Sequence, residues 1–244
     1  MHNHGKFLTK RGGGRGEAVK NIEKGPVRLD FLWINCIIIL ETGRENFYAK
    51  KLRRRGKMNT YSMEIAGLRR ELPICKVTDD LYIGAFICFG DAELTVACAR
   101  ELLKLVPAEE YDYLFTAEAK SIPLIHEMAR QSGAAKYFIA RKGPKAYMPD
   151  PIHVEDQSIT TAGTQKLYLG RDDAELIHGK RILIMDDVIS TGGSLLAMEA
   201  LVKEAGGTVA GKIAVLAEGG AKDRTDIRYL APLPLFNADG SIKA

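Results

Sequence analysis

Cysteine and long apolar runs are both scarce in this chain of 244 residues. Its four cysteines include no C-x-x-C pair, which argues against a disulfide scaffold and against structural zinc. The apolar run at residues 31–40 is half the length of roughly 20 residues that a membrane-spanning helix needs. A signal peptide is not expected, since a long region precedes this run and no small-residue cleavage site follows it. With 46% hydrophobic and 27% charged residues, the chain is typical of a reduced, cytoplasmic, globular protein.

Charge is distributed unevenly along the sequence. Residues 1–57 contain 14 of the 35 Lys and Arg but only 5 of the 31 Asp and Glu, a net charge of +9. The remaining residues, 58–244, contain 21 and 26, a net charge of −5. Because the larger part is mildly acidic, general nucleic-acid binding by it is not expected.

The basic N-terminal segment, residues 1–57, has a composition unlike the rest, with glycines and arginines at 11–16 and a basic cluster at 50–55. Three interpretations are open: an arm that contacts nucleic acid or an anionic membrane, a peripheral membrane anchor, or a poorly ordered extension without function. We favour the extension, with Met58 as the natural start, because regular patterning begins there. The sequence thus divides into an extension, 1–57, and one domain, 58–244.

Strand-like and helix-like segments alternate after Met58, without internal repeats or low-complexity stretches. This alternation predicts an α/β fold of three layers, with a central, mostly parallel sheet flanked by helices. Residues 141–156 have no periodicity and form a long loop, which is uncommon unless functional. Strands are expected at 81–89, 111–116, 136–140, 165–169, 181–185, 208–217 and 227–230, and helices at 93–105, 122–131 and 193–205. In such sheets ligands bind beyond the carboxyl ends of the strands.

The most informative stretch is RILIMDDVISTGGS, residues 181–194. An apolar strand ends in two carboxylates, Asp186 and Asp187. The residues after them suit a phosphate, because glycines let backbone N–H groups approach an anion, hydroxyls donate, and a helix N-terminus adds partial positive charge. These residues are Ser190, Thr191, Gly192, Gly193 and Ser194.

Two carboxylates beside a phosphate site favour a ligand with hydroxyls at its other end. Carboxylates accept hydrogen bonds from a ribose diol, so ribose 5-phosphate fits both halves of the stretch. The P-loop pattern and the G-x-G-x-x-G fingerprint are both absent. A Mg²⁺ site of a phosphatase or ATPase, and a solvated turn with helix-capping hydroxyls, are the alternatives.

This stretch resembles the phosphoribosyl-pyrophosphate signature of the type I phosphoribosyltransferases, and most closely that of adenine phosphoribosyltransferase-like enzymes. The resemblance implies a small hood and a mobile loop around the parallel sheet. It implies that Asp186 and Asp187 are catalytic and bind the ribose hydroxyls. It also implies that the loop residues Val188, Ile189, Ser190, Thr191, Gly192, Gly193 and Ser194 bind the 5-phosphate.

A weaker resemblance covers most of residues 70–235. The segment EAKS at 118–121 is similar to the E-A-R-G turn that binds pyrophosphate, which implies this role for Ala119, Lys120 and Ser121, with Lys120 also catalytic. Arg141 and Lys142, with Lys145 nearby, are similar to the start of the family's mobile loop and imply further pyrophosphate contacts. The structural alternatives are an ordinary exposed lysine at 120 and a solvated loop.

Taken together, the resemblance implies a Mg²⁺-dependent transfer of 5-phosphoribosyl from phosphoribosyl pyrophosphate to a nucleobase, with the metal held through the substrate. Adenine is favoured, giving AMP and pyrophosphate in purine salvage. Residues 161–163 lack the glutamate of the adenine-type E-Y-G segment, and the orotate-type lysine spacing is absent too, so another purine or orotate stays open. The family's habit also implies a homodimer, with no membrane partner and no nucleic acid.

Two other functions are open at this stage: a regulator that senses phosphoribosyl pyrophosphate without catalysis, and a phosphosugar or Mg²⁺ enzyme that releases no pyrophosphate. Lys120 and the cationic loop favour catalysis, since a sensor needs no leaving-group handling. The apolar segment 232–236 is either part of the hood or a capping tail.

Overall fold

The computed structural model describes residues 59–155 and 166–243, so the expectations for residues 1–57 and 161–163 lie outside it. Its strands are β1 (Thr60–Ile65), β2 (Leu68–Lys76), β3 (Tyr82–Gly84), β4 (Tyr113–Ala117), β5 (Tyr137–Ala140), β6 (Ile152–Glu155), β7 (Lys166–Leu169), β8 (Arg181–Ile189), β9 (Thr208–Glu218), β10 (Arg228–Leu233) and β11 (Leu235–Phe236). Its helices are α3 (Ala92–Leu103), α4 (Ile122–Ser132), α5 (Arg171–Ile177) and α6 (Gly193–Glu204), with short 3-10 turns η1 (Ala108–Glu110) and η2 (Gly219–Asp223).

A central sheet of five strands in the order β10-β9-β8-β4-β5 organises the fold, and all four of its pairings are parallel. The middle strand β8 is apolar on both faces, as a covered parallel strand must be. Ile182 and Ile184 face one hydrophobic cluster, while Leu183 and Met185 face the other. This confirms the α/β class and the parallel sheet expected from the alternation.

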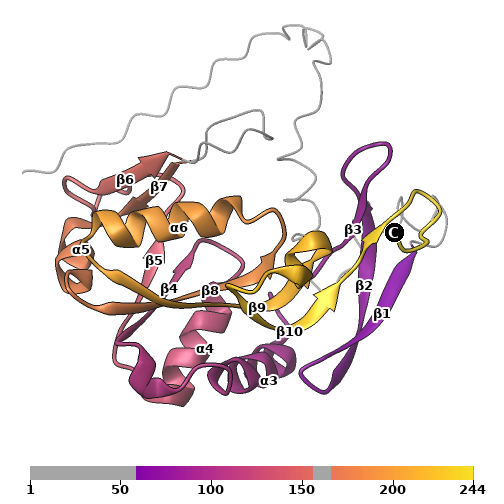
Figure 1. Ribbon diagram of the computed structural model, residues 1–244, viewed down its shortest axis with the longest axis horizontal. Coiled ribbons are helices and arrows are strands. Elements are labelled where there is room, and N and C mark those ends of the chain that lie inside the picture. The colour runs from indigo at the N-terminus through magenta and orange to yellow at the C-terminus, as the bar shows by residue number, and fades with distance from the viewer. Residues whose placement is uncertain (1–58, 156–165, 244) are drawn as a thin grey trace, which may run out of the picture. The chain divides into compact units, whose positions relative to one another are not determined.

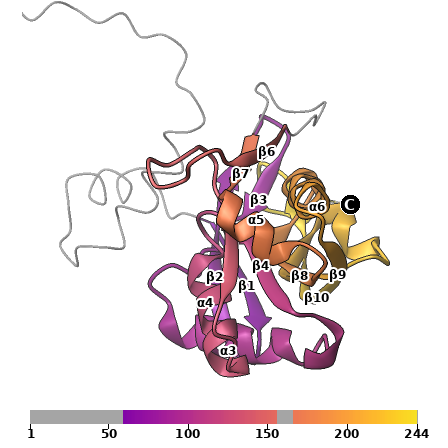
Figure 2. The ribbon, with the colours of Figure 1, turned by 90° about the vertical axis from the view of Figure 1, so that its left-hand side faces the viewer.

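Helices cover both faces of this sheet, as Figures 1 and 2 show, with α3 and α4 on one side and α5 and α6 on the other. The ends of the helices follow local chemistry. Asp91 caps α3 by accepting a hydrogen bond from the Leu94 amide at 3.0 Å. Gly133 closes α4 in the left-handed conformation that glycine adopts easily.

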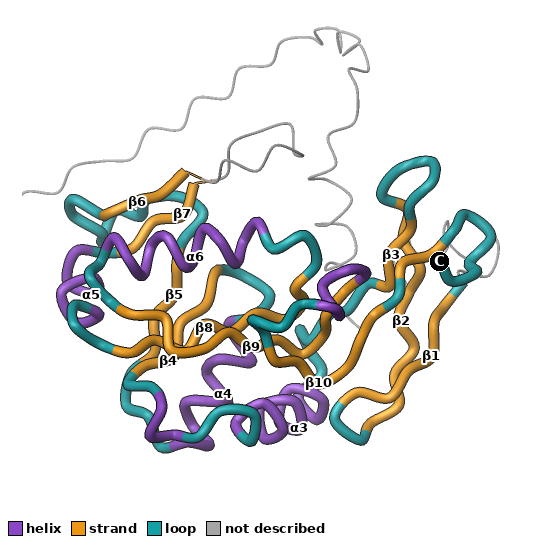
Figure 3. The backbone as a smooth tube through the Cα atoms, in the orientation of Figure 1, coloured by secondary structure: helices purple, strands orange, loops and turns teal. Residues whose placement is uncertain are grey.

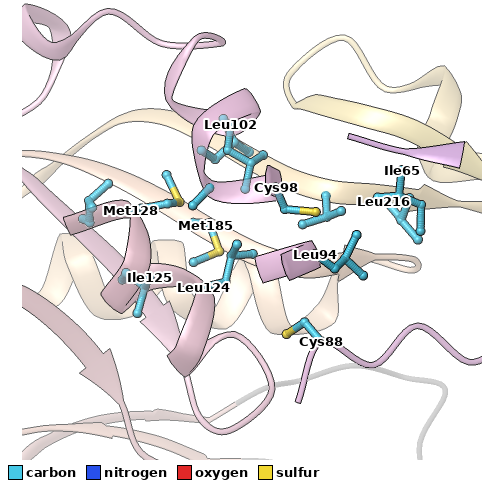
Figure 4. Packing of buried hydrophobic residues seen from close by; sticks show 14 of the residues in the cluster. Ile65, Cys88, Leu94, Cys98, Leu102, Leu124, Ile125, Met128, Met185 and Leu216 are labelled. Atoms are coloured by element: carbon cyan, nitrogen blue, oxygen red, sulfur yellow. The ribbon is translucent and has the colours of Figure 1, made fainter. Parts of the chain in front are cut away.

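The core between α3, α4 and the sheet is made of interlocking aliphatic and sulfur-containing side chains (Figure 4). Leu94, Cys98 and Leu102 of α3 meet Leu124, Ile125 and Met128 of α4 around Met185 of β8. Cys88 and Cys98 belong to this buried set.

A second sheet of four antiparallel strands, in the order β1-β2-β3-β11, forms the small hood. Ala66 and Gly67, both with positive φ, make the two-residue turn between β1 and β2, which is the turn geometry that suits a hairpin. The last strand, β11, pairs with β3 through Leu235 opposite Ile83. The apolar segment 232–236 therefore completes β10 and then joins the hood, which decides between the two interpretations given above.

Several expected boundaries were wrong. The strand expected at 81–89 ends at Gly84, because Phe86 and Cys88 pack into the core as irregular chain rather than pairing in a sheet. The hairpin of β1 and β2 and the helix α5 were not anticipated. The expected loop at 141–156 contains β6, which pairs antiparallel with β7. Among the helices of the described ranges, none has the length and apolarity that crossing a bilayer requires.

Candidate active site

The loop between β8 and α6, drawn in teal in Figure 3, surrounds a small pocket at the carboxyl end of the central strand. Gly192 sits at the helix N-cap with φ of +86°, a conformation that glycine adopts at little cost. The cavity has a volume of about 110 Å³, which is room for more than one water molecule. Its lining comprises Asp186, Val188, Ile189, Ser190, Thr191, Gly192, Gly193, Ser194 and Leu195. Every residue expected in the phosphate loop therefore lies at this one pocket.

The carboxylate pair lies within the last part of β8 rather than after it, because that strand continues to Ile189. Asp186 is half-buried and lines the pocket, whereas the Asp187 side chain is only 4% exposed and does not line it. The two neighbouring aspartates thus have different surroundings, and only Asp186 faces the space that a ligand could fill.

Ser121, at the start of α4, connects the two aspartates. Its hydroxyl donates to Asp186 Oδ1 at 2.9 Å and accepts the Asp187 backbone N–H at 3.0 Å. The Ser121 side chain is buried. The family resemblance implies that Ser121 binds pyrophosphate, and in the structure its side chain contacts the carboxylate pair.

Lys120 reaches the same point from the turn after β4. Because β4 and β8 are adjacent parallel strands, their carboxyl ends meet at one edge of the sheet, and the Thr116 hydroxyl ties them by donating to the Met185 carbonyl at 2.7 Å. The Lys120 ammonium lies 2.7 Å from Asp187 Oδ2. The peptide bond between Glu118 and Ala119, just before this lysine, is cis.

Asp186 and Lys120 both have raised pKa values, for different reasons. Burial, together with the neighbouring Asp187 carboxylate, raises the pKa of Asp186 to about 7. Burial opposes the charge of Lys120, but the ion pair with Asp187 outweighs it and raises the lysine pKa above its ordinary value. At neutral pH the lysine is therefore charged, and Asp186 takes up a proton more readily than an ordinary aspartate does.

The cations of the loop after β5 gather around Glu118. Arg141 Nε lies 3.0 Å from Glu118 Oε2, and Lys145 Nζ lies 3.7 Å from Oε1. The Lys142 backbone N–H also donates to Glu118 Oε1. The three cationic residues predicted to contact pyrophosphate are thus held next to the turn that carries Lys120.

Two residues near this cluster were missed at the sequence level. Glu218 ends β9, directly after Ala217, which pairs with Ile189 of β8. It is buried, and burial raises its pKa, while the Ser190 hydroxyl and Lys120 favour its ionised form. Its place at the carboxyl end of an apolar strand was a usable signal. Cys88, whose Sγ donates to the Lys120 carbonyl at 3.2 Å, had no such signal.

A metal would have to be held largely by its ligand here. Within residues 59–155 and 166–243, no three His, Cys, Asp or Glu side chains converge as a protein metal site would require. Mg²⁺ is commonly held by one or two carboxylates together with substrate phosphates. Asp186, at the wall of the pocket, is a carboxylate of the kind that such an ion could use together with substrate oxygens.

The sequence of this chain is similar to those of known phosphoribosyltransferases. Residues 97–231 match the phosphoribosyl transferase domain family. A hypoxanthine/guanine phosphoribosyltransferase of Methanotorris igneus is 32% identical over 59% of this chain and 76% of its own length. An adenine phosphoribosyltransferase of Corynebacterium jeikeium is 39% identical over 53% of this chain, which spans 59% of that protein.

The fold has a solved counterpart as well. The crystal structure of adenine phosphoribosyltransferase from Thermoanaerobacter pseudethanolicus superimposes with a TM-score of 0.50 at 24% identity, covering 59% of this chain and 83% of that one. This structural similarity supports the fold alone, whereas the sequence matches support membership of the family. The chain belongs to the phosphoribosyltransferase family, whose members are pentosyltransferase enzymes.

Proposed function

We propose that this chain transfers the 5-phosphoribosyl group of phosphoribosyl pyrophosphate to a purine base, with adenine favoured, in purine salvage. The observation that carries the proposal is the convergence of a small pocket lined by the predicted phosphate loop, a carboxylate at its wall and a partly buried lysine at one edge of the sheet. A bond forms between a base nitrogen and the anomeric carbon, the bond from that carbon to pyrophosphate breaks, and the base loses the proton of that nitrogen.

The phosphate loop would bind the 5-phosphate through backbone N–H groups of residues 190–194 and the N-terminus of α6. Asp186, which faces the pocket, would accept hydrogen bonds from the ribose hydroxyls and offset the positive charge that develops on the sugar. Asp187 is buried against Lys120 and would act by holding that ammonium in place.

Pyrophosphate would be bound on the opposite side of the sugar from the base. Lys120 supplies a fixed positive charge there, with Ala119 and Ser121 in the same turn, and Arg141, Lys142 and Lys145 stand close by on the loop after β5. When bound, Mg²⁺ would neutralise the charge of the leaving pyrophosphate. Water must be excluded from this site, because it attacks the same carbon as the base.

The wider proposal covers the rest of the chain. Residues 58–244 form the phosphoribosyltransferase domain, and residues 1–57 are an extension. The family resemblance suggests a homodimer, and the cysteine content suggests a cytoplasmic protein. The relatives are divided between adenine and hypoxanthine/guanine enzymes, which supports a purine and leaves the base to experiment.

The test is pyrophosphate release from phosphoribosyl pyrophosphate and Mg²⁺, with adenine, guanine, hypoxanthine, xanthine, orotate and uracil supplied separately and a reaction without base as control. Release with adenine alone supports the proposal in full, and release with another purine alone supports the transferase and corrects the base. Tight binding of phosphoribosyl pyrophosphate without release for any base would instead identify a sensor.

A further inference from the structure

The guanidinium of Arg224 lies directly against Gly192, the left-handed glycine of the phosphate loop. A Cβ atom at residue 192 would stand 2.5 Å from Arg224 Nη1 and 3.7 Å from its Cζ. Real Cβ atoms do not approach other atoms this closely, so a side chain at 192 would have to displace the end of the Arg224 side chain. The positive φ of this residue favours glycine independently. Two residues 32 positions apart in sequence are therefore in contact at the site.

Arg224 is held in this place by a bidentate ion pair. Its Nε donates to Asp226 Oδ1 at 2.9 Å and its Nη2 donates to Oδ2 at 2.7 Å. Asp226 Oδ2 also accepts a hydrogen bond from Lys212 Nζ at 2.6 Å, and Lys212 reaches Glu199 of α6 at 3.0 Å. These ion pairs, from Arg224 through Asp226 and Lys212 to Glu199, connect the guanidinium to β9 and to α6.

One nitrogen of this guanidinium remains on the loop side. Among the described residues, Nη1 donates no hydrogen bond, while Nε and Nη2 are both engaged by Asp226. Nη1 is the atom nearest to the Gly192 position. Arg224 does not line the pocket itself, so its charge stands behind the glycine, close to the helix N-terminus that would face a phosphate.

We propose that Arg224 is a positioning residue for the 5-phosphate, which holds the left-handed turn at Gly192 and adds positive charge behind the loop. This inference rests on the proposed function of the loop at 190–194. It assigns to Arg224 the selection of ligands that carry a 5-phosphate, without a role in the chemistry at the anomeric carbon. Its effect falls on binding of the phosphorylated sugar and leaves the pyrophosphate end unchanged.

The experiment compares Arg224→Gln with the full-length parent. We measure the dissociation constants of ribose 5-phosphate and of pyrophosphate, and KM and kcat with phosphoribosyl pyrophosphate. The expected result is a rise of about tenfold in the ribose 5-phosphate Kd and in KM, with kcat and the pyrophosphate Kd within about twofold. Arg224→Lys, which keeps the charge, recovers part of the affinity.

Arg130→Gln is the matched control, because Arg130 makes the same bidentate pair with Glu127 on α4, away from the loop. It should leave all four quantities unchanged. If Arg224→Gln does not fold, Arg224→Lys and Asp226→Asn take its place, and each must weaken ribose 5-phosphate more than pyrophosphate. Equal weakening of the two ligands, or no change in a folded variant, overturns the inference.

Failure of this inference and failure of the proposed function give different results. If the parent binds ribose 5-phosphate but releases no pyrophosphate with any base, the transferase proposal fails while the binding comparison still tests Arg224. If the parent releases pyrophosphate and Arg224→Gln binds ribose 5-phosphate as the parent does, only the inference about Arg224 fails.

Discussion

The ammonium of Lys120 lies 2.7 Å from Oδ2 of Asp187, joining the turn after β4 to the end of β8. The two partners differ in exposure: the Asp187 side chain is 4% exposed and that of Lys120 is 34% exposed. A buried carboxylate that loses its cation keeps its desolvation cost, whereas a partly exposed ammonium can turn to water. Removing the lysine should therefore cost more stability than removing the carboxylate, and variants of each residue test this.

Lys120→Met should lower the thermal midpoint more than Asp187→Asn does, because it leaves Asp187 buried without its cation. The double variant should be more stable than Lys120→Met alone. A double-mutant cycle from thermal or urea unfolding measures the coupling between the two residues. Additive effects would show that the pair contributes nothing to stability beyond its separate residues.

Asp187→Asn should reduce turnover by about 100-fold while the fold survives, because the Lys120 ammonium loses the group that orients it for the leaving pyrophosphate. The measurement is kcat for pyrophosphate release with the preferred base, with circular dichroism to verify folding. Asp172→Asn, at an exposed aspartate in the first turn of α5, is the matched control. Unchanged turnover would remove Asp187 from the mechanism.

The raised pKa of Asp186 predicts how both activity and folding stability depend on pH. The carboxylate is protonated below about 7, so kcat/KM for phosphoribosyl pyrophosphate should fall as pH decreases through that value. Because the folded pKa lies above the unfolded one, ionised Asp186 destabilises the fold increasingly from about pH 4 to about pH 7.

Asp186→Asn should therefore raise the melting temperature at pH 8, do so less at pH 5, and abolish transfer. Differential scanning calorimetry at the two pH values checks the stability, and pyrophosphate release checks the activity. An equal stabilisation at both pH values would show that the pKa of Asp186 is not raised in the folded protein.

Glu118 competes for the loop cations that pyrophosphate would need. It pairs with Arg141 and Lys145, so Glu118→Gln should tighten pyrophosphate binding by up to about fivefold, the range expected for partly exposed ion pairs. Calorimetric titration with pyrophosphate gives the affinity. Glu155→Gln, which breaks the exposed pair with Lys166, is the control. Weaker binding in Glu118→Gln would mean that Glu118 orients the cations rather than competing for them.

Residues close together in the sequence could be interpreted without the structure. The apolar run ending in Asp186 and Asp187, with the hydroxyls and glycines after it, predicts strand, phosphate loop and helix because each step depends on local periodicity and backbone freedom. In the structure Asp186 and residues 188–194 line one pocket, whereas Asp187 does not. The long alternation of apolar segments likewise predicted the parallel sheet and its two helical layers.

Segments without a clean period were predicted less well. β6 lies in a stretch with prolines and charges, and its strand conformation depends on pairing with β7 rather than on its own composition. Phe86 and Cys88 look like strand residues, yet tertiary packing places them in the core beside α3 without a strand partner. Local propensity does not contain these long-range contacts.

The sequence by itself determined the chemistry that is available at the end of β8: two carboxylates, hydroxyls, glycines and a helix start within 14 residues. Only the tertiary structure decided which of these groups faces the pocket and which is held by residues elsewhere in the chain. It turned Asp186 toward the pocket and buried Asp187 against Lys120, and it placed Arg224 behind Gly192. These relationships join residues that are far apart along the chain, and they exist because parallel pairing brings the carboxyl ends of separate strands to one edge of the sheet.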